Sequence, residues 1–261
     1  MRKNRLVKMT VAIVALAALV TGGYIYKDAI QSRIARTAAV VSGQDIKPLL
    51  DSEGRYIRQI VAQDNSTSRT IMWQSDSSEA DAVIEYRVDG AENIQSIGAT
   101  DKVFTDDGST TYIHEGTLTG LTPSTKYEYR IGYGTDRRSD WYSLETAGSS
   151  VYDVLIYPDS QSGDYSQWEE IVKDSALRNP RTALYISMGD LVDNGEQAYQ
   201  WRTWLNSIKP LSANVPLATT LGNHEMYTLD WKMREPYAYL NYFAVPPNGN
   251  ETFNRRYYSY D

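Results

Sequence analysis

Oxygen-rich side chains follow three apolar segments of the sequence, at the point where each segment ends. Asp159 and Gln161 follow the first segment, and Asp190 follows the second. Asn223 and His224 follow the third. Because parallel strands end at one edge of an open α/β sheet, we expect these side chains to meet at that edge. Carboxylate, amide and imidazole groups suit metals such as Mn, Fe and Zn, so the pattern predicts a metal site.

Alternating strands and helices are expected to position these groups. Apolar runs predict strands at 151–157, 183–188 and 215–221, each ending shortly before one of the polar groups. Helical spacing of apolar residues predicts helices at 165–177 and 197–208. The β-α-β-α-β order implies a parallel sheet with right-handed crossovers, and therefore an α/β fold for this part of the chain.

The apolar faces of the two predicted helices should lie against the sheet. Trp168 in the first helix and Trp201 and Trp204 in the second are expected to pack on the strands. The other residues of the first helix expected to point inward are Ile171, Val172 and Leu177. These aromatic and aliphatic residues are therefore interpreted as core.

Oxygen ligands from three neighbouring strand ends are what a dinuclear metal site requires. Such a site combines terminal ligands with one carboxylate that bridges two cations roughly 3.5–4 Å apart. The two cations can clamp a phosphate group, lower the pKa of a water molecule and offset charge during an in-line attack. Gly189 and Gly222 would let the backbone turn sharply beneath the cations.

Three short motifs together resemble those of the calcineurin-like metallophosphoesterase family. Any one of them alone would be a weak signal, but their order and spacing combine into a specific one. The motifs are Asp159-x-Gln161, Gly189-Asp190-x-x-Asp193 and Gly222-Asn223-His224-Glu225.

The resemblance implies a role for five of these residues. Asp159 would bind the first metal, Asp190 would bridge both, and Asn223 would bind the second. His224 would contact the substrate phosphate or its leaving group, with a general-acid role as one option. Glu225 would orient His224 by accepting its other N–H. The implied cofactors are two divalent or trivalent ions of Mn, Fe or Zn.

Two positions depart from the family pattern. Many members carry a histidine two residues after the first aspartate, where this chain has Gln161. An amide oxygen is a weaker, neutral ligand, so Gln161 is interpreted as either a metal ligand or a neighbour of one. Purple enzymes carry a metal-binding tyrosine where this chain has Asp193, so no purple colour is expected. Asp193 and Asn194 are interpreted as turn and capping residues.

The chain contains only two histidines, His114 and His224. The family supplies further histidine ligands later in its sequence. We therefore expect the catalytic domain to be incomplete in this chain, and this fragment to be inactive alone. His114 lies in the preceding β-rich part and is expected to be structural.

Residues 54–147 alternate apolar and polar positions in short segments separated by turns, which predicts a β-sandwich. Tyr127 follows a turn at the start of a predicted strand, as in a tyrosine corner, whose hydroxyl bonds to upstream backbone. With Trp73 on an early strand, this part resembles a fibronectin type III module. Such a module ahead of the phosphoesterase motifs narrows the resemblance to the branch that includes purple acid phosphatases.

The N-terminus predicts export. Basic residues end at Lys8 and are followed by the apolar run 9–20, so 1–26 is interpreted as a signal peptide or an uncleaved membrane anchor. Residues 27–53 would form a stalk or juxtamembrane helix. The net charge of −7 argues against nonspecific binding of nucleic acid. The absence of cysteine excludes disulfides, zinc–thiolate sites and cysteine nucleophiles.

These observations lead to one function and one rival. We expect an extracytoplasmic, secreted or membrane-anchored hydrolase in which residues 151–261 form part of a metallophosphoesterase domain. It would cleave small phosphate esters with a hydroxide activated by two metals. The rival is a catalytically degenerate cell-surface binding or scaffolding protein, which Gln161 and the few histidines favour. The ester, the metal and the oligomeric state are left open by the sequence.

Overall fold

The computed structural model describes residues 54–79, 81–148 and 152–261. The predicted leader and stalk lie outside the described residues. Within these ranges, no helix combines the length and the apolar character that a membrane span requires.

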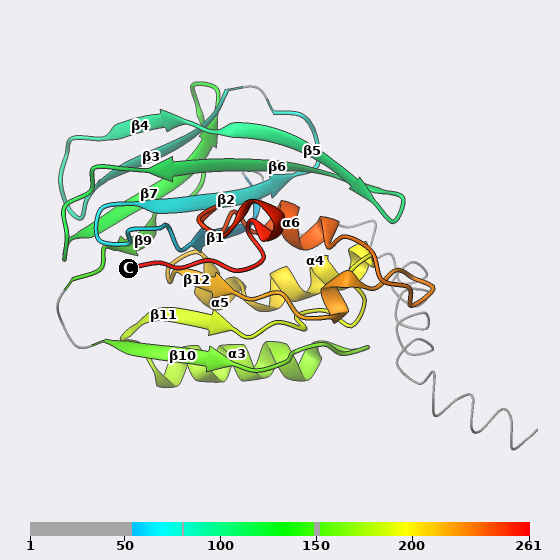
Figure 1. Cartoon of the computed structure of the whole chain (residues 1–261). Coiled ribbons are helices and arrows are strands. Elements are labelled where there is room, and N and C mark those ends of the chain that lie inside the picture. Colours follow the sequence, from blue (N-terminus) through cyan, green and yellow to red (C-terminus); the bar gives the residue numbers. More distant parts are fainter. Residues whose placement is uncertain (1–53, 80, 149–151) are drawn as a thin grey trace, which may run out of the picture.

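The largest element is a seven-stranded mixed sheet. Three of its neighbouring strand pairs are parallel and three are antiparallel. Figure 1 shows its parallel strands β10 and β11 at one side and its antiparallel strands β2, β5 and β6 at the other. In spatial order the strands are β10 (Asp153–Tyr157), β11 (Thr182–Ser187), β12 (Leu217–Thr219), β1 (Arg55–Ile60), β2 (Arg69–Ser75), β6 (Ser109–Leu118) and β5 (Thr100–Asp106).

A second, antiparallel sheet packs on the β1–β2–β6 part of the first and completes a sandwich. Trp73, which is fully buried, lies in the core between the two sheets. The strands of the second sheet are β4 (Gln95–Gly98), β3 (Ala82–Val88), β7 (Lys126–Tyr133) and β8 (Arg137–Arg138), with β9 (Tyr142–Glu145) also paired to β7.

Strand β1 joins the sandwich to the α/β part. It pairs antiparallel with β2 and parallel with β12, where Ile60 lies opposite Leu217. Arg58 on β1 is fully buried, and its Nε and Nη2 donate to the Tyr242 carbonyl at 2.9 and 2.7 Å. Burial lowers the pKa of this guanidinium to about 10, so it stays charged at neutral pH. One sheet therefore runs through both halves. The domain boundaries at 54–147 and 151–261 stay a prediction.

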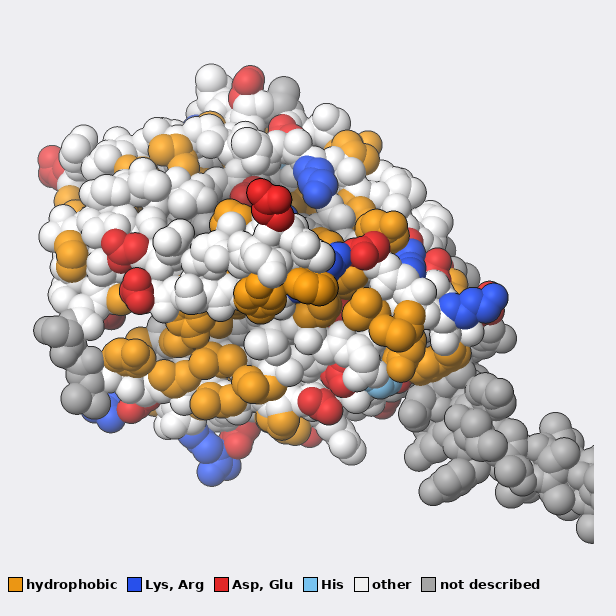
Figure 2. Space-filling model, viewed as in Figure 1, with side chains coloured by type: hydrophobic (Ala, Val, Ile, Leu, Met, Phe, Trp, Pro, Cys, Tyr) orange, Lys and Arg blue, Asp and Glu red, His pale blue; other side chains and the backbone are white. Residues whose placement is uncertain are grey.

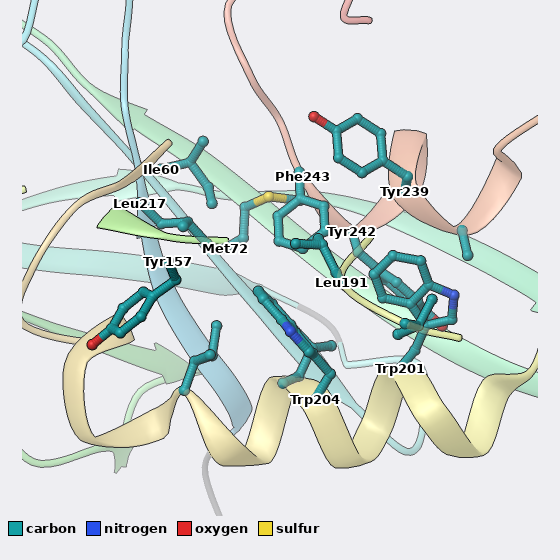
Figure 3. Close-up of a cluster of buried hydrophobic side chains, with 14 of the residues drawn as sticks. Ile60, Met72, Tyr157, Leu191, Trp201, Trp204, Leu217, Tyr239, Tyr242 and Phe243 are labelled. Atoms are coloured by element: carbon teal, nitrogen blue, oxygen red, sulfur yellow. The ribbon is translucent and has the colours of Figure 1, made fainter. Parts of the chain in front are cut away.

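Helices cover one face of the parallel strands. Figure 3 shows Trp201 and Trp204 projecting from α4 toward Tyr242 and Phe243. The Trp204 and Phe243 rings meet edge to face, with centroids 5.9 Å apart. The predicted packing of the tryptophans, Trp168 included, is confirmed by their burial. The helices are α3 (Ser166–Arg178), α4 (Ala198–Ser207), α5 (Lys209–Ser212) and α6 (Tyr237–Tyr242), with 3-10 turns at His224–Met226 and Glu251–Phe253.

The opposite face of β10 and β11 carries exposed apolar side chains. Figure 2 shows such side chains gathered over these two strands. Ile156 on β10 is 62% exposed, and Met188 just after β11 is 52% exposed. Strand β10 is also the outer strand of the sheet.

Two expectations about α3 are wrong. Ile171 and Leu177 were predicted to point inward, but they are 53% and 81% exposed. Because an α-helix turns about 100° per residue, Leu177 lies about 180° around the axis from the buried Trp168. Val172, one turn after Trp168, is buried as predicted.

The tyrosine corner is confirmed. The hydroxyl oxygen of Tyr127 accepts a hydrogen bond from the Thr122 backbone N–H at 2.9 Å. This bond fixes the turn that leads into β7, as the position of a tyrosine at a strand start predicted.

Candidate active site

The three predicted strand-end loops meet at Asp190. The backbone N–H groups of Ser160 and Gln161, which follow β10, donate to the Asp190 carbonyl at 3.0 and 2.9 Å. The backbone N–H of His224, which follows β12, donates to Asp190 Oδ1 at 2.8 Å. Asp190 follows β11, the middle of the three strands. Hydrogen bonds from backbone N–H groups to the carbonyl and carboxylate of Asp190 therefore bring the three loops together at one edge of the sheet.

Close backbone packing explains the two glycines at this point. A Cβ at Gly222 would lie 2.1 Å from Asp190 Oδ1 and 2.4 Å from the Asp190 backbone nitrogen. A Cβ at Gly189 would lie 2.9 Å from the Gly222 nitrogen, and Gly189 has a φ of 92°. Asp190 itself has a φ of 45°, in the left-handed region that non-glycine residues rarely adopt. The predicted sharp turns are present, and they present the Asp190 carboxylate in a strained backbone conformation.

Glu225 holds the second and third loops together. Its carboxylate is fully buried, and one oxygen accepts from the backbone N–H groups of Asp190 and Gly222 at 3.0 and 2.8 Å. The other oxygen accepts from the N–H groups of Leu191 and Val192 at 2.7 and 3.3 Å. The carboxylate thus accepts hydrogen bonds from four backbone N–H groups of two loops.

Burial raises the pKa of Glu225 to about 7. The backbone N–H donors act against this rise, and the nearby negative charge of Asp190 adds to it. A carboxylate this deeply enclosed serves the loop structure, because all its acceptor positions face main chain.

The expected contact between Glu225 and the His224 ring is not formed. Instead, His224 Nδ1 lies 2.7 Å from the Asp193 carbonyl oxygen and 3.7 Å from Asp193 Oδ1. The reason is geometric, since Glu225 is turned toward the four backbone donors. A carbonyl oxygen can only accept, so Nδ1 carries a proton and Nε2 is the nitrogen left for a ligand.

Aromatic rings enclose the other sides of His224. The rings of Tyr227 and Trp231 meet it edge to face, with centroid distances of 5.3 and 6.0 Å. Together with the Asp193 contact, these rings fix the orientation of the imidazole.

Asp193 is the site residue that sequence reasoning missed. It was interpreted as a turn residue, yet it is 3% exposed and contacts the His224 ring. Its own backbone N–H donates to Gln200 Oε1 at 2.6 Å, so α4 fixes its position. The spacing Asp190-x-x-Asp193 was the available signal, but the shortest contact is made by a main-chain oxygen, which any residue type would supply.

The predicted metal ligands present oxygen atoms with few competing partners. Asp159 and Asn223 are exposed at the edge, and Asn223 Nδ2 donates to the Tyr227 hydroxyl at 3.3 Å. The Oε1 atom of Gln161 is buried and has no hydrogen-bond partner among the described residues. Carboxylate and amide oxygens fit hard or borderline cations, and an unpartnered buried oxygen is the kind of atom a cation satisfies. Across the described ranges, no three or more His, Cys, Asp and Glu side chains form a group that could hold a metal ion.

The fold and these loops define a class of protein, an α/β phosphoesterase joined to a β-sandwich. The family model for the purple acid phosphatase N-terminal domain matches residues 56–146, and the model for calcineurin-like phosphoesterases matches residues 138–260. The chain belongs to the calcineurin-like phosphoesterases that carry a purple acid phosphatase N-terminal domain.

Curated relatives agree with this assignment. Purple acid phosphatase 23 of Arabidopsis thaliana is 26% identical over 61% of this chain and 41% of its own length. Phosphoenolpyruvate phosphatase of Allium cepa is 27% identical over 59% of this chain and 33% of its own length. Probable inactive purple acid phosphatase 27 of Arabidopsis thaliana is 28% identical over 46% of this chain and 22% of its own length. The chain thus spans less than half the length of each.

A solved structure supports the fold. Purple acid phosphatase PPD1 from yellow lupin (Lupinus luteus) seeds superposes with a TM-score of 0.66 at 21% identity. The match covers 78% of this chain and 43% of the lupin chain.

Proposed function

We propose that this chain carries a metal-dependent phosphoesterase site and acts in the hydrolysis of phosphate esters. The observation that carries the proposal is the meeting of three strand-end loops at Asp190, through hydrogen bonds from Ser160, Gln161 and His224. Membership in a phosphoesterase family supports it.

In this proposal the exposed edge holds two cations, Mn, Fe or Zn. Asp159, Asp190 and Asn223 would be ligands, and the unpartnered oxygen of Gln161 would face the same cations. When bound, the metals would supply Lewis acidity that activates water and offsets the charge of the phosphate. A complete dinuclear site would need further ligands beyond these four.

The protein groups have separate tasks. His224 presents Nε2 to the phosphate or its leaving group, because its Nδ1 is engaged by the Asp193 carbonyl. In its protonated form Nε2 can donate a proton to a leaving oxygen. Glu225 keeps the loops of Asp190 and His224 in register without touching substrate.

The second candidate is a catalytically degenerate binding or scaffolding protein. Two observations favour it: the neutral Gln161 at a predicted ligand position, and the name of a relative, which calls that relative probably inactive. The four backbone bonds of Glu225 weigh against it, because they maintain the geometry of the edge around Asp190.

Export and module type belong to the same proposal. The basic residues before the apolar run 9–20 support secretion or membrane anchoring. The tyrosine corner at Tyr127 supports a fibronectin type III-like module at 54–147, followed by part of the phosphoesterase domain at 151–261.

The test combines metal binding with hydrolysis. Purified protein is loaded with Mn, Fe or Zn, its metal content is measured, and it is assayed with p-nitrophenyl phosphate and bis(p-nitrophenyl) phosphate. We expect Asp190→Asn to weaken metal binding by about 100-fold or more, since losing even an outer partner of a metal ligand costs about 10–100-fold. Any hydrolysis should fall with it.

Asp174→Asn is the matched control. It makes the same chemical change on the exposed face of α3, where Asp174 pairs with Arg178. Equal metal affinity in wild type, Asp190→Asn and Asp174→Asn would refute the metal site. Metal binding without hydrolysis of either ester would favour the degenerate candidate.

A further inference from the structure

A second cluster of reactive side chains lies in the sandwich, across three neighbouring strands. His114 on β6 lies directly opposite Asp101 on β5, and its Nδ1 is 2.5 Å from Asp101 Oδ1. On its other side, His114 Nε2 is 2.8 Å from the Oγ of Ser75 at the end of β2. The order Ser75–His114–Asp101 reproduces the contacts of a nucleophile, a base and an orienting carboxylate.

Hydrogen-bond chemistry determines which nitrogen of His114 acts as the base. An ionised carboxylate only accepts, so the contact with Asp101 places a proton on Nδ1. In the neutral ring, the lone pair is then on Nε2, which faces Ser75. The Ser75 hydroxyl also lies 2.8 Å from the Ser77 carbonyl, so it has two acceptors for its single proton.

The imidazole is held rigidly. It is 1% exposed and stacks on Trp73, with centroids 5.1 Å apart and planes inclined by 22°. The ring of Tyr133 meets it edge to face at 5.5 Å, and the Tyr133 hydroxyl is fixed by the Trp73 Nε1 donor at 2.8 Å. Such packing keeps a base aligned with its nucleophile before any substrate arrives.

The serine end of the cluster is open to solvent. Ser75 is half-buried and is followed by the exposed residues 76–78. In the part of the chain that the structure describes, the backbone N–H groups of Ser77 and Ser78 donate no hydrogen bond. Free N–H groups beside a nucleophile can stabilise the oxyanion that forms when the nucleophile attacks a carbonyl.

Local charge indicates the class of substrate. Near the serine end, Asp76 pairs with Arg55 and Glu79 pairs with Arg137, whereas Asp101 lies at the opposite nitrogen of the His114 ring. Because carboxylates already match the two arginines, the serine end presents no net positive charge from these groups to attract an anionic phosphate ester, and an uncharged carboxylic ester suits it better.

We propose that Ser75 is a nucleophilic serine, activated by His114 and positioned through Asp101, that hydrolyses small uncharged carboxylic esters. Ser75 Oγ forms a bond to the carbonyl carbon while its proton passes to His114 Nε2. The ester C–O bond then breaks, and the alcohol leaves with that proton. Water, deprotonated by the same nitrogen, hydrolyses the acyl-serine, so ester and water become acid and alcohol.

The test uses an alkyl fluorophosphonate on the folded protein. Ser75 Oγ would form a bond to phosphorus as the P–F bond breaks, with fluoride leaving and the hydroxyl proton passing to His114. We expect mass spectrometry of the digested protein to place the adduct on Ser75. Heat-unfolded wild type should not be labelled, and Ser75→Ala should remove the adduct.

Two further variants separate an activated serine from an ordinary exposed one. Asp101→Asn should slow labelling more than tenfold, and should lower kcat for p-nitrophenyl acetate with KM within about twofold, since Asp101 does not touch substrate. Ser96→Ala, at an exposed serine on β4 in the other sheet, is the matched control and should be labelled as wild type is. Circular dichroism and thermal unfolding confirm that each variant is folded. Absence of an adduct on Ser75 in folded wild type, or equal labelling of Asp101→Asn, would overturn the proposal.

Discussion

Replacing Gly222 by alanine tests the geometry of the candidate active site most directly. The new Cβ would lie 2.1 Å from Asp190 Oδ1, where ordinary contact begins at 3.4 Å, so the carboxylate would have to move by about 1.3 Å. The Cβ would also lie 2.4 Å from the Asp190 backbone nitrogen, so rotating the side chain cannot relieve the clash.

Both stability and function should respond. Overpacking of a tight site costs about 1–3 kcal/mol of unfolding free energy. A misplacement of about 1 Å at a reacting centre costs about 100-fold in rate, and the affinity for metal should fall because the predicted bridging carboxylate moves. Urea unfolding, metal titration and phosphate-ester hydrolysis measure the three effects separately.

Gly98→Ala serves as the control. A Cβ at Gly98 would meet no heavy atom within 4 Å, and Gly98 has no positive φ, so its replacement should change none of the three readings. If Gly222→Ala matched Gly98→Ala in stability and in metal affinity, the close approach of the two loops would be refuted.

Two other predictions concern the sandwich. Tyr127→Phe should lower the free energy of unfolding, measured in urea, by about 1–3 kcal/mol, because the Thr122 backbone N–H loses its acceptor. Tyr152→Phe, at an exposed position, is the control and should have no effect. Equal losses in the two variants would contradict the tyrosine corner. Partial burial acts to raise the pKa of Glu85, but hydrogen bonds from Arg138 and Arg130 outweigh it and lower the pKa in the folded protein. The ionised Glu85 carboxylate therefore stabilises the fold above the unfolded pKa near 4.5. This stabilisation is lost as the pH falls through the lower pKa of the folded state. Glu85→Gln should therefore reduce the loss of stability on acidification, measured as thermal unfolding against pH, and an unchanged acid profile would disprove this account.

The arrangement of the α/β part could be read from local pattern. Its three strands end before Asp159, Asp190 and Asn223 as predicted, and backbone N–H groups of the first and third following loops donate to Asp190 in the second. Apolar runs and helical spacing are local properties of the sequence, so they predict strands and helices without information about distant contacts.

Other features have no local signature. Strands Gln95–Gly98 and Thr100–Asp106 have little signal in the sequence, because most of their residues are exposed and lack an apolar alternation. The hydrogen-bond partner of the His224 ring was predicted wrongly because the contact is made by the Asp193 carbonyl. Every residue has a main-chain carbonyl, so residue type does not indicate which one will accept a hydrogen bond. Pairing of Ile60 with Leu217 joins residues far apart in the chain, which spacing alone could not foresee.

That pairing has a mechanical consequence. A hinge between the family-matched regions would have to break main-chain bonds along β1 and pull the charged Arg58 away from the carbonyl that satisfies it. Swinging of one half against the other is thus opposed by the sheet itself, and the sandwich acts as a rigid platform under the phosphoesterase loops. Stiffness at the end of β12 would then be set by residues that precede it by more than a hundred positions.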